Sequence, residues 1–219
     1  MKHIEGLDKN NMFFGLREKL TTEQIIYVES IFNNQMTIVN APSGTGKTTL
    51  AVAVAKIIGK PLFYVFSPVE EGKMGFREGS QAKKESAYLA PLLDALIKIG
   101  EQPDKVVLAE ATIKEQKFSG AWVFPKSHTF LRGSNLEDTT VIFDEFQNWT
   151  ISEAKKALTR VHDNCKTIVI GHSGQIDLKN PKDSCLERVV THFENEPYAQ
   201  VCELTVNFRG ALARHADKL

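Results

Sequence analysis

The chain has 219 residues, 42% of them hydrophobic and 25% charged, and its 27 basic residues balance its 27 acidic ones. That length and composition suit one globular α/β domain with small appendages. The zero net charge excludes a broadly basic nucleic-acid-binding protein and leaves only a local basic patch open.

Membrane-spanning and secretory segments are not expected. No apolar run approaches the ~18 residues that indicate a membrane span, and the first residues contain no apolar signal core. The three cysteines, Cys165, Cys185 and Cys202, lack the spacing of a metal or redox motif, which favours reduced thiols in a cytoplasmic protein.

Strand and helix patterns alternate along the chain. After irregular residues 1–20, the pattern predicts a helix over about 23–32, a strand over 36–40, a helix over 47–58, a strand over 61–66 and a loop over 67–84. It then predicts a helix over 86–99, strands over 122–124 and 140–143, a helix over 152–162, a strand over 167–170, a helix over 184–193, a strand over 201–205 and a helix over 209–217. Residues 101–121 give no clear pattern. The alternation indicates a three-layer α/β fold with a mainly parallel sheet, whose ligands bind beyond the carboxyl ends of the strands.

The strongest motif lies between the strand over 36–40 and the helix over 47–58. Its residues follow the P-loop pattern, except that Ala41 stands at the usual first glycine. Gly44 and Gly46 let backbone N–H groups curve around a polyphosphate, Lys47 supplies a charge for the β- and γ-phosphates, and the Thr48 hydroxyl is suited to Mg²⁺. We therefore expect ATP binding by Ser43, Gly44, Thr45, Gly46, Lys47, Thr48 and Thr49. The alternative is a chance turn before a helix.

An acidic pair follows the apolar strand over 140–143. Asp144 is suited to hold Mg²⁺ together with Thr48, and Glu145 to orient or polarise the attacking water. The alternative for this pair is an acidic turn.

Polar residues after the later strands complete the candidate site. Gln175, after the strand over 167–170, is placed to reach the γ-phosphate or the attacking water, unless it belongs to a plain polar turn. Arg209 follows the last strand and is a candidate arginine finger on the ATP of a neighbouring subunit. A surface or helix-capping role is the alternative for Arg209, as it is for Arg132. Gln24 either reads the adenine edge or forms a capping box with Thr21.

The loop over 70–84 mixes basic and acidic residues. Phe76 beside Arg77 is a candidate for stacking on a nucleic-acid base, and Arg132 is a further candidate contact. A solvated loop explains the same residues equally well.

Taken together, these motifs resemble the PhoH family of P-loop ATPases, whose core is related to superfamily-one helicases. The resemblance covers roughly residues 20–215 and rests on the order and spacing of six segments, which are residues 41–48, 67–70, 75–76, 131–133, 144–148 and 171–178. It implies a single RecA-like ATPase domain over 21–219 behind an extension over 1–20, with Mg²⁺ and ATP as cofactors. It also implies action on RNA or single-stranded nucleic acid, and a ring-forming homo-oligomer such as a hexamer. In the helicase relatives, the equivalents of Gln147 and Gln175 couple nucleotide state to nucleic acid. A short member of this kind resembles phage-encoded versions.

Three positions depart from the family pattern. His172 stands where an acid is expected, which weakens coupling or turnover because an imidazole does not replace a carboxylate. Phe146 replaces a small residue and changes packing. Asn207 stands where an acid is more common before the arginine, which makes the finger role of Arg209 less secure.

The sequence thus favours an ATPase coupled to single-stranded RNA or DNA, with a possible helicase or RNA-processing role. A second hypothesis is a non-enzymatic ATP-dependent switch or scaffold, which His172 and the neutral net charge keep open. A less favoured third hypothesis is a P-loop kinase, which needs an acceptor pocket and an arginine-rich lid.

Overall fold

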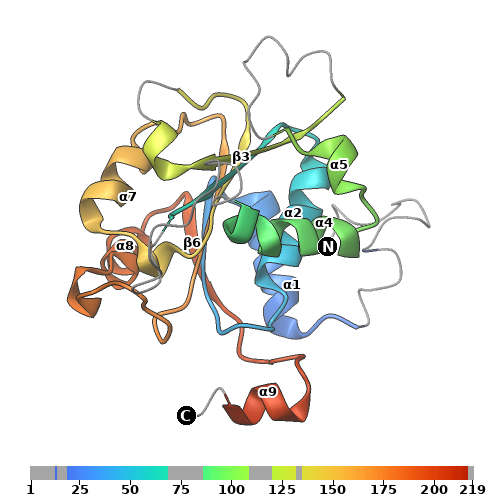
Figure 1. The fold of residues 1–219 in the computed structure, drawn as a ribbon. Coiled ribbons are helices and arrows are strands. Elements are labelled where there is room, and N and C mark those ends of the chain that lie inside the picture. Colours follow the sequence, from blue (N-terminus) through green and yellow to red (C-terminus); the bar gives the residue numbers. More distant parts are fainter. Residues whose placement is uncertain (1–12, 14–18, 69–85, 109–119, 132–134, 217–219) are drawn as a thin grey trace, which may run out of the picture.

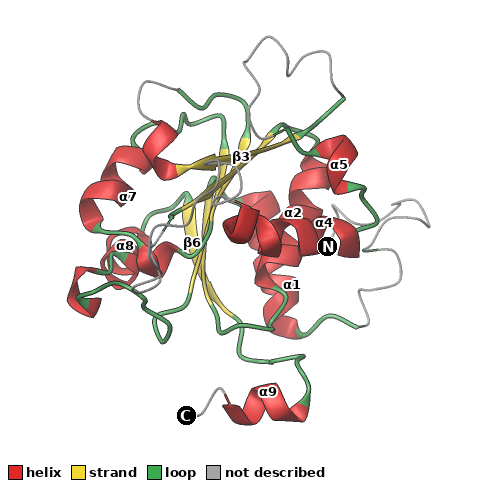
Figure 2. Cartoon of the chain, viewed as in Figure 1, coloured by secondary structure: helices red, strands yellow, loops and turns green. Residues whose placement is uncertain are grey.

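The computed structural model describes residues 13, 19–68, 86–108, 120–131 and 135–216. Its centre is a sheet of six strands, ordered β3-β2-β4-β5-β1-β6, in which every neighbouring pair is parallel (Figure 2). The strands are β1 (Met36–Asn40), β2 (Leu62–Phe66), β3 (Val123–Ser127), β4 (Thr140–Phe143), β5 (Lys166–Gly171) and β6 (Ala199–Glu203). Because all run the same way, their carboxyl ends meet at one edge of the sheet.

Helices cover both faces of this sheet (Figure 1). One face carries α1 (Thr22–Asn33), α2 (Lys47–Ile58), α4 (Ala90–Lys98) and the short α5 (Pro103–Val106). The other carries α7 (Ile151–Leu158) and α8 (Leu186–Phe193). Single 3₁₀ turns lie at η2 (Ser86–Leu89), η3 (His128–Leu131), η4 (Phe146–Asn148) and η5 (Pro181–Asp183), and α9 (Ala211–Ala216) lies beyond the carboxyl edge.

Two separate apolar cores explain why the strands read as continuous apolar runs. In β4, Ile142 packs into the core beneath α1, α2 and α4, whereas Val141 and Phe143 pack into the core beneath α7 and α8. Successive side chains point to opposite faces of a strand, so a sheet covered on both faces needs apolar residues at every position. Phe13 is buried in the first core, so at least this residue of the predicted extension over 1–20 packs against the domain.

The predicted elements are largely confirmed, with differences of a few residues at several of their ends, the larger of which are the following. The helix expected over 86–99 begins as the 3₁₀ turn η2, and the helix expected over 152–162 ends at Leu158. Strand β3 runs on to Ser127, and β6 spans 199–203 rather than 201–205. Within the stretch over 101–121 that gave no pattern, Pro103 starts the single helical turn α5. No described helix is both long and apolar enough to cross a bilayer.

Candidate nucleotide site

The P-loop joins β1 to α2 at the carboxyl edge of the sheet. Gly44 and Gly46 have φ values of +82° and +85°, which side-chain-bearing residues rarely adopt, and Gly46 caps α2. The Thr45 hydroxyl and the Lys47 ammonium both donate to the Pro42 carbonyl, at 3.1 and 3.3 Å. The loop is therefore already curled around the position of a bound polyphosphate.

The first turn of α1 supports this loop from behind. The Gln24 side-chain amide donates to the Thr45 carbonyl at 2.9 Å and accepts from the Thr21 backbone N–H at 3.2 Å. Thr21 and Gln24 thus form the capping box that the sequence allowed. Since Gln24 is buried and bonded at both ends of its amide, its contact with adenine stays a prediction.

Asp144 lies at the end of β4 and is buried. Its carboxylate accepts from the Tyr64 hydroxyl and, at 2.9 Å, from the Glu145 backbone N–H. Burial, reinforced by the charge of Glu145, raises the pKa of Asp144 to about 6, although Lys47 and the two hydrogen bonds act in the opposite direction. A buried carboxylate whose negative charge is not fully balanced by its neighbours is suited to bind a cation. The Thr48 hydroxyl makes no hydrogen bond within the described residues. The Asp144 carboxylate and the Thr48 hydroxyl both fit Mg²⁺, which prefers hard oxygen ligands.

Lys47 lies in the same electrostatic environment. Burial lowers the pKa of Lys47, and this effect outweighs the attraction of Asp144 and Glu145, while the charge of Arg209 lowers the pKa further. The structure therefore brings together the predicted Lys47, Asp144, Glu145 and Arg209 from separate parts of the chain.

Glu145 occupies a backbone conformation that is unusual for a residue with a side chain. Its φ is +49°, and the turn η4 follows directly. Its carboxylate accepts from the Gln147 side-chain amide at 2.6 Å, and the oxygen of that amide accepts from the His172 backbone N–H at 3.1 Å. Gln147 thereby connects Glu145 to the end of β5 and fixes the direction in which an otherwise exposed carboxylate points.

Gln175 lies in the loop after β5, across from the P-loop. The Ser43 hydroxyl donates to its side-chain oxygen at 3.3 Å. The same loop is tied to η4, because Asn148 donates to the Asp177 carboxylate at 3.0 Å and accepts from the Asp177 backbone N–H at 2.7 Å. A cleft of about 600 Å³ opens here, with Asp144, Glu145 and Gln175 among its walls.

The strap, defined as residues 204–210 after β6, lies across the P-loop of its own chain. Thr205 donates from its backbone N–H and its hydroxyl to the Glu23 carboxylate, both at 2.7 Å, and the Phe208 N–H donates to the Gly44 carbonyl at 2.9 Å. A Cβ added to Gly44 would lie 2.5 Å from Asn207 Oδ1 and 2.6 Å from Arg209 Cγ. Arg209 therefore lies against its own nucleotide site, which the sequence did not reveal, and its action on a neighbouring subunit stays a prediction.

Some residues of the site could not have been identified from the sequence. Tyr64 sits in an apolar strand and looks like any core aromatic, and nothing in the sequence pairs it with Asp144. Glu23 reads as a first-turn acid of α1, and its link to Thr205 depends on tertiary structure. The nucleic-acid candidates Phe76, Arg77 and Arg132 lie outside the described residues.

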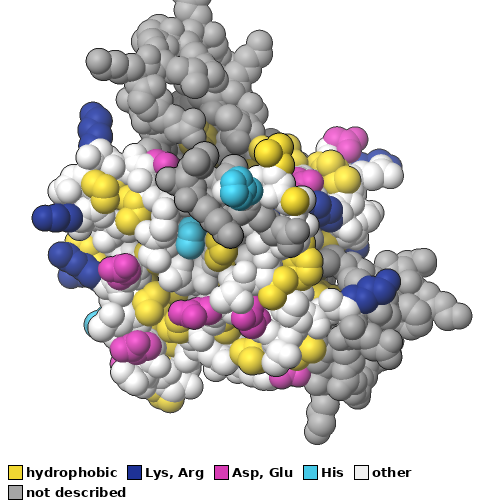
Figure 3. Space-filling view, turned by 90° about the horizontal axis from the view of Figure 1, so that it is seen from below, with side chains coloured by type: hydrophobic (Ala, Val, Ile, Leu, Met, Phe, Trp, Pro, Cys, Tyr) yellow, Lys and Arg dark blue, Asp and Glu magenta, His cyan; other side chains and the backbone are white. Residues whose placement is uncertain are grey.

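Charge at the carboxyl edge is mixed. Seen from that side, Lys and Arg side chains lie mainly at the rim of the described surface, and most Asp and Glu side chains lie nearer its middle (Figure 3). This agrees with the zero net charge of the chain and means that any attraction of a polyanion has to be local.

Comparisons with known proteins agree on the family. The model of the PhoH-like protein family matches residues 18–216. The PhoH-like protein of Bacillus subtilis (strain 168) is 35% identical over 180 residues, which is 80% of this chain and 53% of the relative. The PhoH-like protein of Mycobacterium tuberculosis (strain H37Rv) is 33% identical over 192 residues, or 84% and 52% of the two chains. Protein PhoH of Escherichia coli (strain K12) is 29% identical over 180 residues, or 79% and 49%.

The chain thus spans about half the length of the curated relatives it matches. Among solved structures, the helicase domain of Pyrococcus furiosus Hef matches with a TM-score of 0.52 and 16% identity, covering 88% of this chain and 39% of that one. A likeness of this kind shows the fold alone, and it confirms the predicted RecA-like α/β architecture. Because the family model matches nearly the whole described domain, this chain belongs to the PhoH-like family and carries a nucleotide-binding P-loop domain.

Proposed function

We propose that this protein binds ATP with Mg²⁺ and hydrolyses it, and that hydrolysis is coupled to single-stranded RNA or DNA. The proposal is carried by the convergence of Lys47, Asp144 and Glu145 at one edge of the sheet. They lie close enough for the charge of each to shift the pKa of at least one of the others. A site that only bound a nucleotide would not need an acid beyond the one that holds the metal.

Binding of the polyphosphate falls to the P-loop. Its curved backbone and the N-terminal end of α2 offer N–H groups to the phosphates, and Lys47 adds a positive charge. Thr48 and Asp144 would hold Mg²⁺, which neutralises phosphate charge and orients the terminal group. A bound cation would balance the buried negative charge of Asp144 and remove its free-energy cost, so nucleotide and metal together are expected to stabilise the folded protein.

Activation of water falls to Glu145. Its carboxylate lines the cleft next to the P-loop, and the hydrogen bond from Gln147 keeps one oxygen engaged while the other remains to accept from a water. In this proposal Gln175 senses the terminal phosphate, which its hydrogen bond with Ser43 of the P-loop supports. Because Arg209 lies against its own P-loop, we propose that it stabilises the transferring phosphate within the same chain, in place of the action on a neighbouring subunit expected from the sequence.

Nucleic-acid coupling is supported by the fold and by two glutamine side chains. The fold is shared with a helicase domain, and the Gln147 and Gln175 side chains link the nucleotide site to neighbouring loops. Assembly into a homo-oligomeric ring and the helicase or RNA-processing role belong to the same proposal, as does a cytoplasmic location.

The test is phosphate release from ATP and Mg²⁺, with and without single-stranded RNA and DNA. Lys47→Ala and Glu145→Gln are expected to abolish turnover, whereas Glu203→Gln, an exposed glutamate at the end of β6, is expected to leave it unchanged. One nucleic acid is expected to raise the wild-type rate.

Two other outcomes would redirect the proposal. ATP binding without turnover under any condition would favour a switch or scaffold. Phosphate transfer to an added acceptor, with little release to water, would favour a kinase that uses the cleft beside Glu145 as its acceptor pocket.

A further inference from the structure

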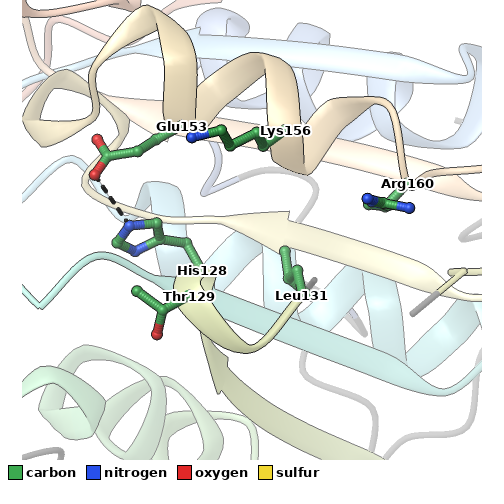
Figure 4. A pocket seen from close by; sticks show the side chains of 6 residues that line it. All are labelled: His128, Thr129, Leu131, Glu153, Lys156 and Arg160. Carbon is green, nitrogen blue, oxygen red and sulfur yellow. Dashed lines mark hydrogen bonds and ion pairs between the residues drawn. The ribbon is translucent and has the colours of Figure 1, made fainter. Parts of the chain in front are cut away.

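A second hollow lies on the other face of the sheet, between η3 and α7. Its volume is about 370 Å³, at the lower end of the range for ligand pockets. Figure 4 shows the side chains that line it, which are His128, Thr129, Leu131, Glu153, Lys156 and Arg160. None of them belongs to the nucleotide site.

One wall carries two cations that lack partners in the described part of the chain. Lys156 lies in the last turn of α7 and Arg160 lies two residues beyond the end of that helix. Neither side chain makes an ion pair or hydrogen bond with another described residue. Arg160 is held in place by its backbone, whose carbonyl accepts from the Leu136 N–H at 2.9 Å.

The only carboxylate among the lining residues is already engaged. One oxygen of Glu153 accepts from the backbone N–H and the hydroxyl of Thr150, both at 2.8 Å, and the other lies 3.1 Å from Nε2 of His128. Figure 4 shows this pairing at one end of the hollow, with Lys156 between it and Arg160. The lining therefore has two cations against one carboxylate, and that carboxylate is held by the helix cap and by His128 rather than by Lys156 or Arg160.

His128 contributes a further unused polar atom. Its ring packs on the buried Trp149, with centroids 5.0 Å apart, and its Nδ1 is shielded from solvent without a hydrogen-bond partner among the described residues. The hydroxyl of the exposed Thr129 is already hydrogen-bonded to that of Ser127, at 3.0 Å. His128 also directly follows β3, so this end of the hollow opens at the same edge of the sheet as the P-loop.

From these features we infer that the hollow between η3 and α7 binds the phosphodiester backbone of a single-stranded nucleic acid, with Lys156 and Arg160 contacting its phosphates. The proposal rests on the proposed coupling to nucleic acid and adds the place where the strand lies. It also explains how a chain of zero net charge holds a polyanion, since two unpaired cations act locally.

The test uses a fluorescent single-stranded oligonucleotide and two double variants of equal charge. Lys156→Ala/Arg160→Ala removes the cations of the hollow, and Lys155→Ala/Lys182→Ala removes two exposed lysines outside it. Loss of two phosphate contacts makes the plot of log K against log salt concentration less steep by about 1.4. Between 1 M and 0.1 M salt, the affinity of Lys156→Ala/Arg160→Ala is therefore expected to rise about 25-fold less than that of the wild type. The control is expected to keep the wild-type slope, and thermal unfolding checks that both variants are folded.

The outcomes separate this proposal from the one on which it rests. If the wild type binds the strand and both double variants lose affinity equally, or neither does, the hollow is not the backbone site, and coupling to nucleic acid stands. If the wild type binds neither RNA nor DNA at low salt, the coupling itself fails and the proposed site fails with it.

Discussion

Replacing Asp144 by asparagine is expected to stabilise the protein when no metal or nucleotide is present. In EDTA the native state carries Asp144 as a buried carboxyl with a pKa of about 6, against an ordinary value of 3.8 in the unfolded chain. The difference corresponds to about 3 kcal/mol of lost stability at pH 8, where the group is ionised in both states. Asparagine avoids this cost and keeps both contacts, because its oxygen can accept from the Glu145 N–H while its amide donates to Tyr64.

The sign of the pH dependence follows from the raised pKa. As the pH falls through 6, the native carboxyl takes up a proton before the unfolded one does, so the wild type gains stability until about pH 4. The advantage of Asp144→Asn is therefore largest at pH 8, about 6–12 °C in Tm for a chain of this size, and it vanishes near pH 4. The exposed Asp104→Asn serves as the control.

Thermal unfolding in EDTA between pH 4 and 8 measures this effect, and a second series with Mg²⁺ and ATP completes it. The added ligands are expected to stabilise the wild type and not Asp144→Asn, which reverses the order of the two proteins. If Asp144→Asn unfolds at or below the wild-type temperature at pH 8 in EDTA, or if the gap does not close on acidification, the buried charge is not the source of the cost.

Two further predictions concern the strap. Gly44→Ala and Gly100→Ala both place a side chain at positive φ, which costs about 1–2 kcal/mol. Only the new Cβ at Gly44 would contact the strap, because nothing lies within 4 Å of a Cβ added at Gly100. Gly44→Ala is therefore expected to unfold at the lower temperature and to be cleaved faster by trypsin after Arg209, and equal behaviour would argue against a docked strap. If Arg209 acts on its own nucleotide, mixing Lys47→Ala with Arg209→Ala protein is expected to restore no ATP hydrolysis. Restored hydrolysis would show that Arg209 acts between subunits.

The local pattern of the chain was sufficient to predict most of the fold. Helix α2 and strand β4 were expected at the residues where they occur, because the P-loop glycines and the acidic pair mark their ends. The structure of residues 101–121 was not predicted. A single helical turn such as α5 is too short for its apolar residues to show a helical repeat in the sequence. Strand order was also beyond reach, because register between distant strands depends on packing rather than on local preference.

The site was predictable where its residues belong to a contiguous motif and not where tertiary contacts define it. Lys47, Asp144 and Glu145 each follow a strand, so the rule that parallel strands end at one edge brings them together. The contact of Arg209 with Gly44 joins residues far apart in the chain, and only the path of the strap after β6 produces it. Gln24 shows the intermediate case, because its capping box was visible in the sequence and its bond to Thr45 was not.

The reciprocal bonds between Asn148 and Asp177 determine how movement would spread from the site. A shift of the loop that carries Gln175 must either break both bonds, at about 1 kcal/mol each, or carry η4 along with it. Glu145 directly precedes η4, so a movement of the Gln175 loop that carried η4 with it would also move the Glu145 carboxylate. Under our proposal, the release of the terminal phosphate from Gln175 would then reach the residue that activates water.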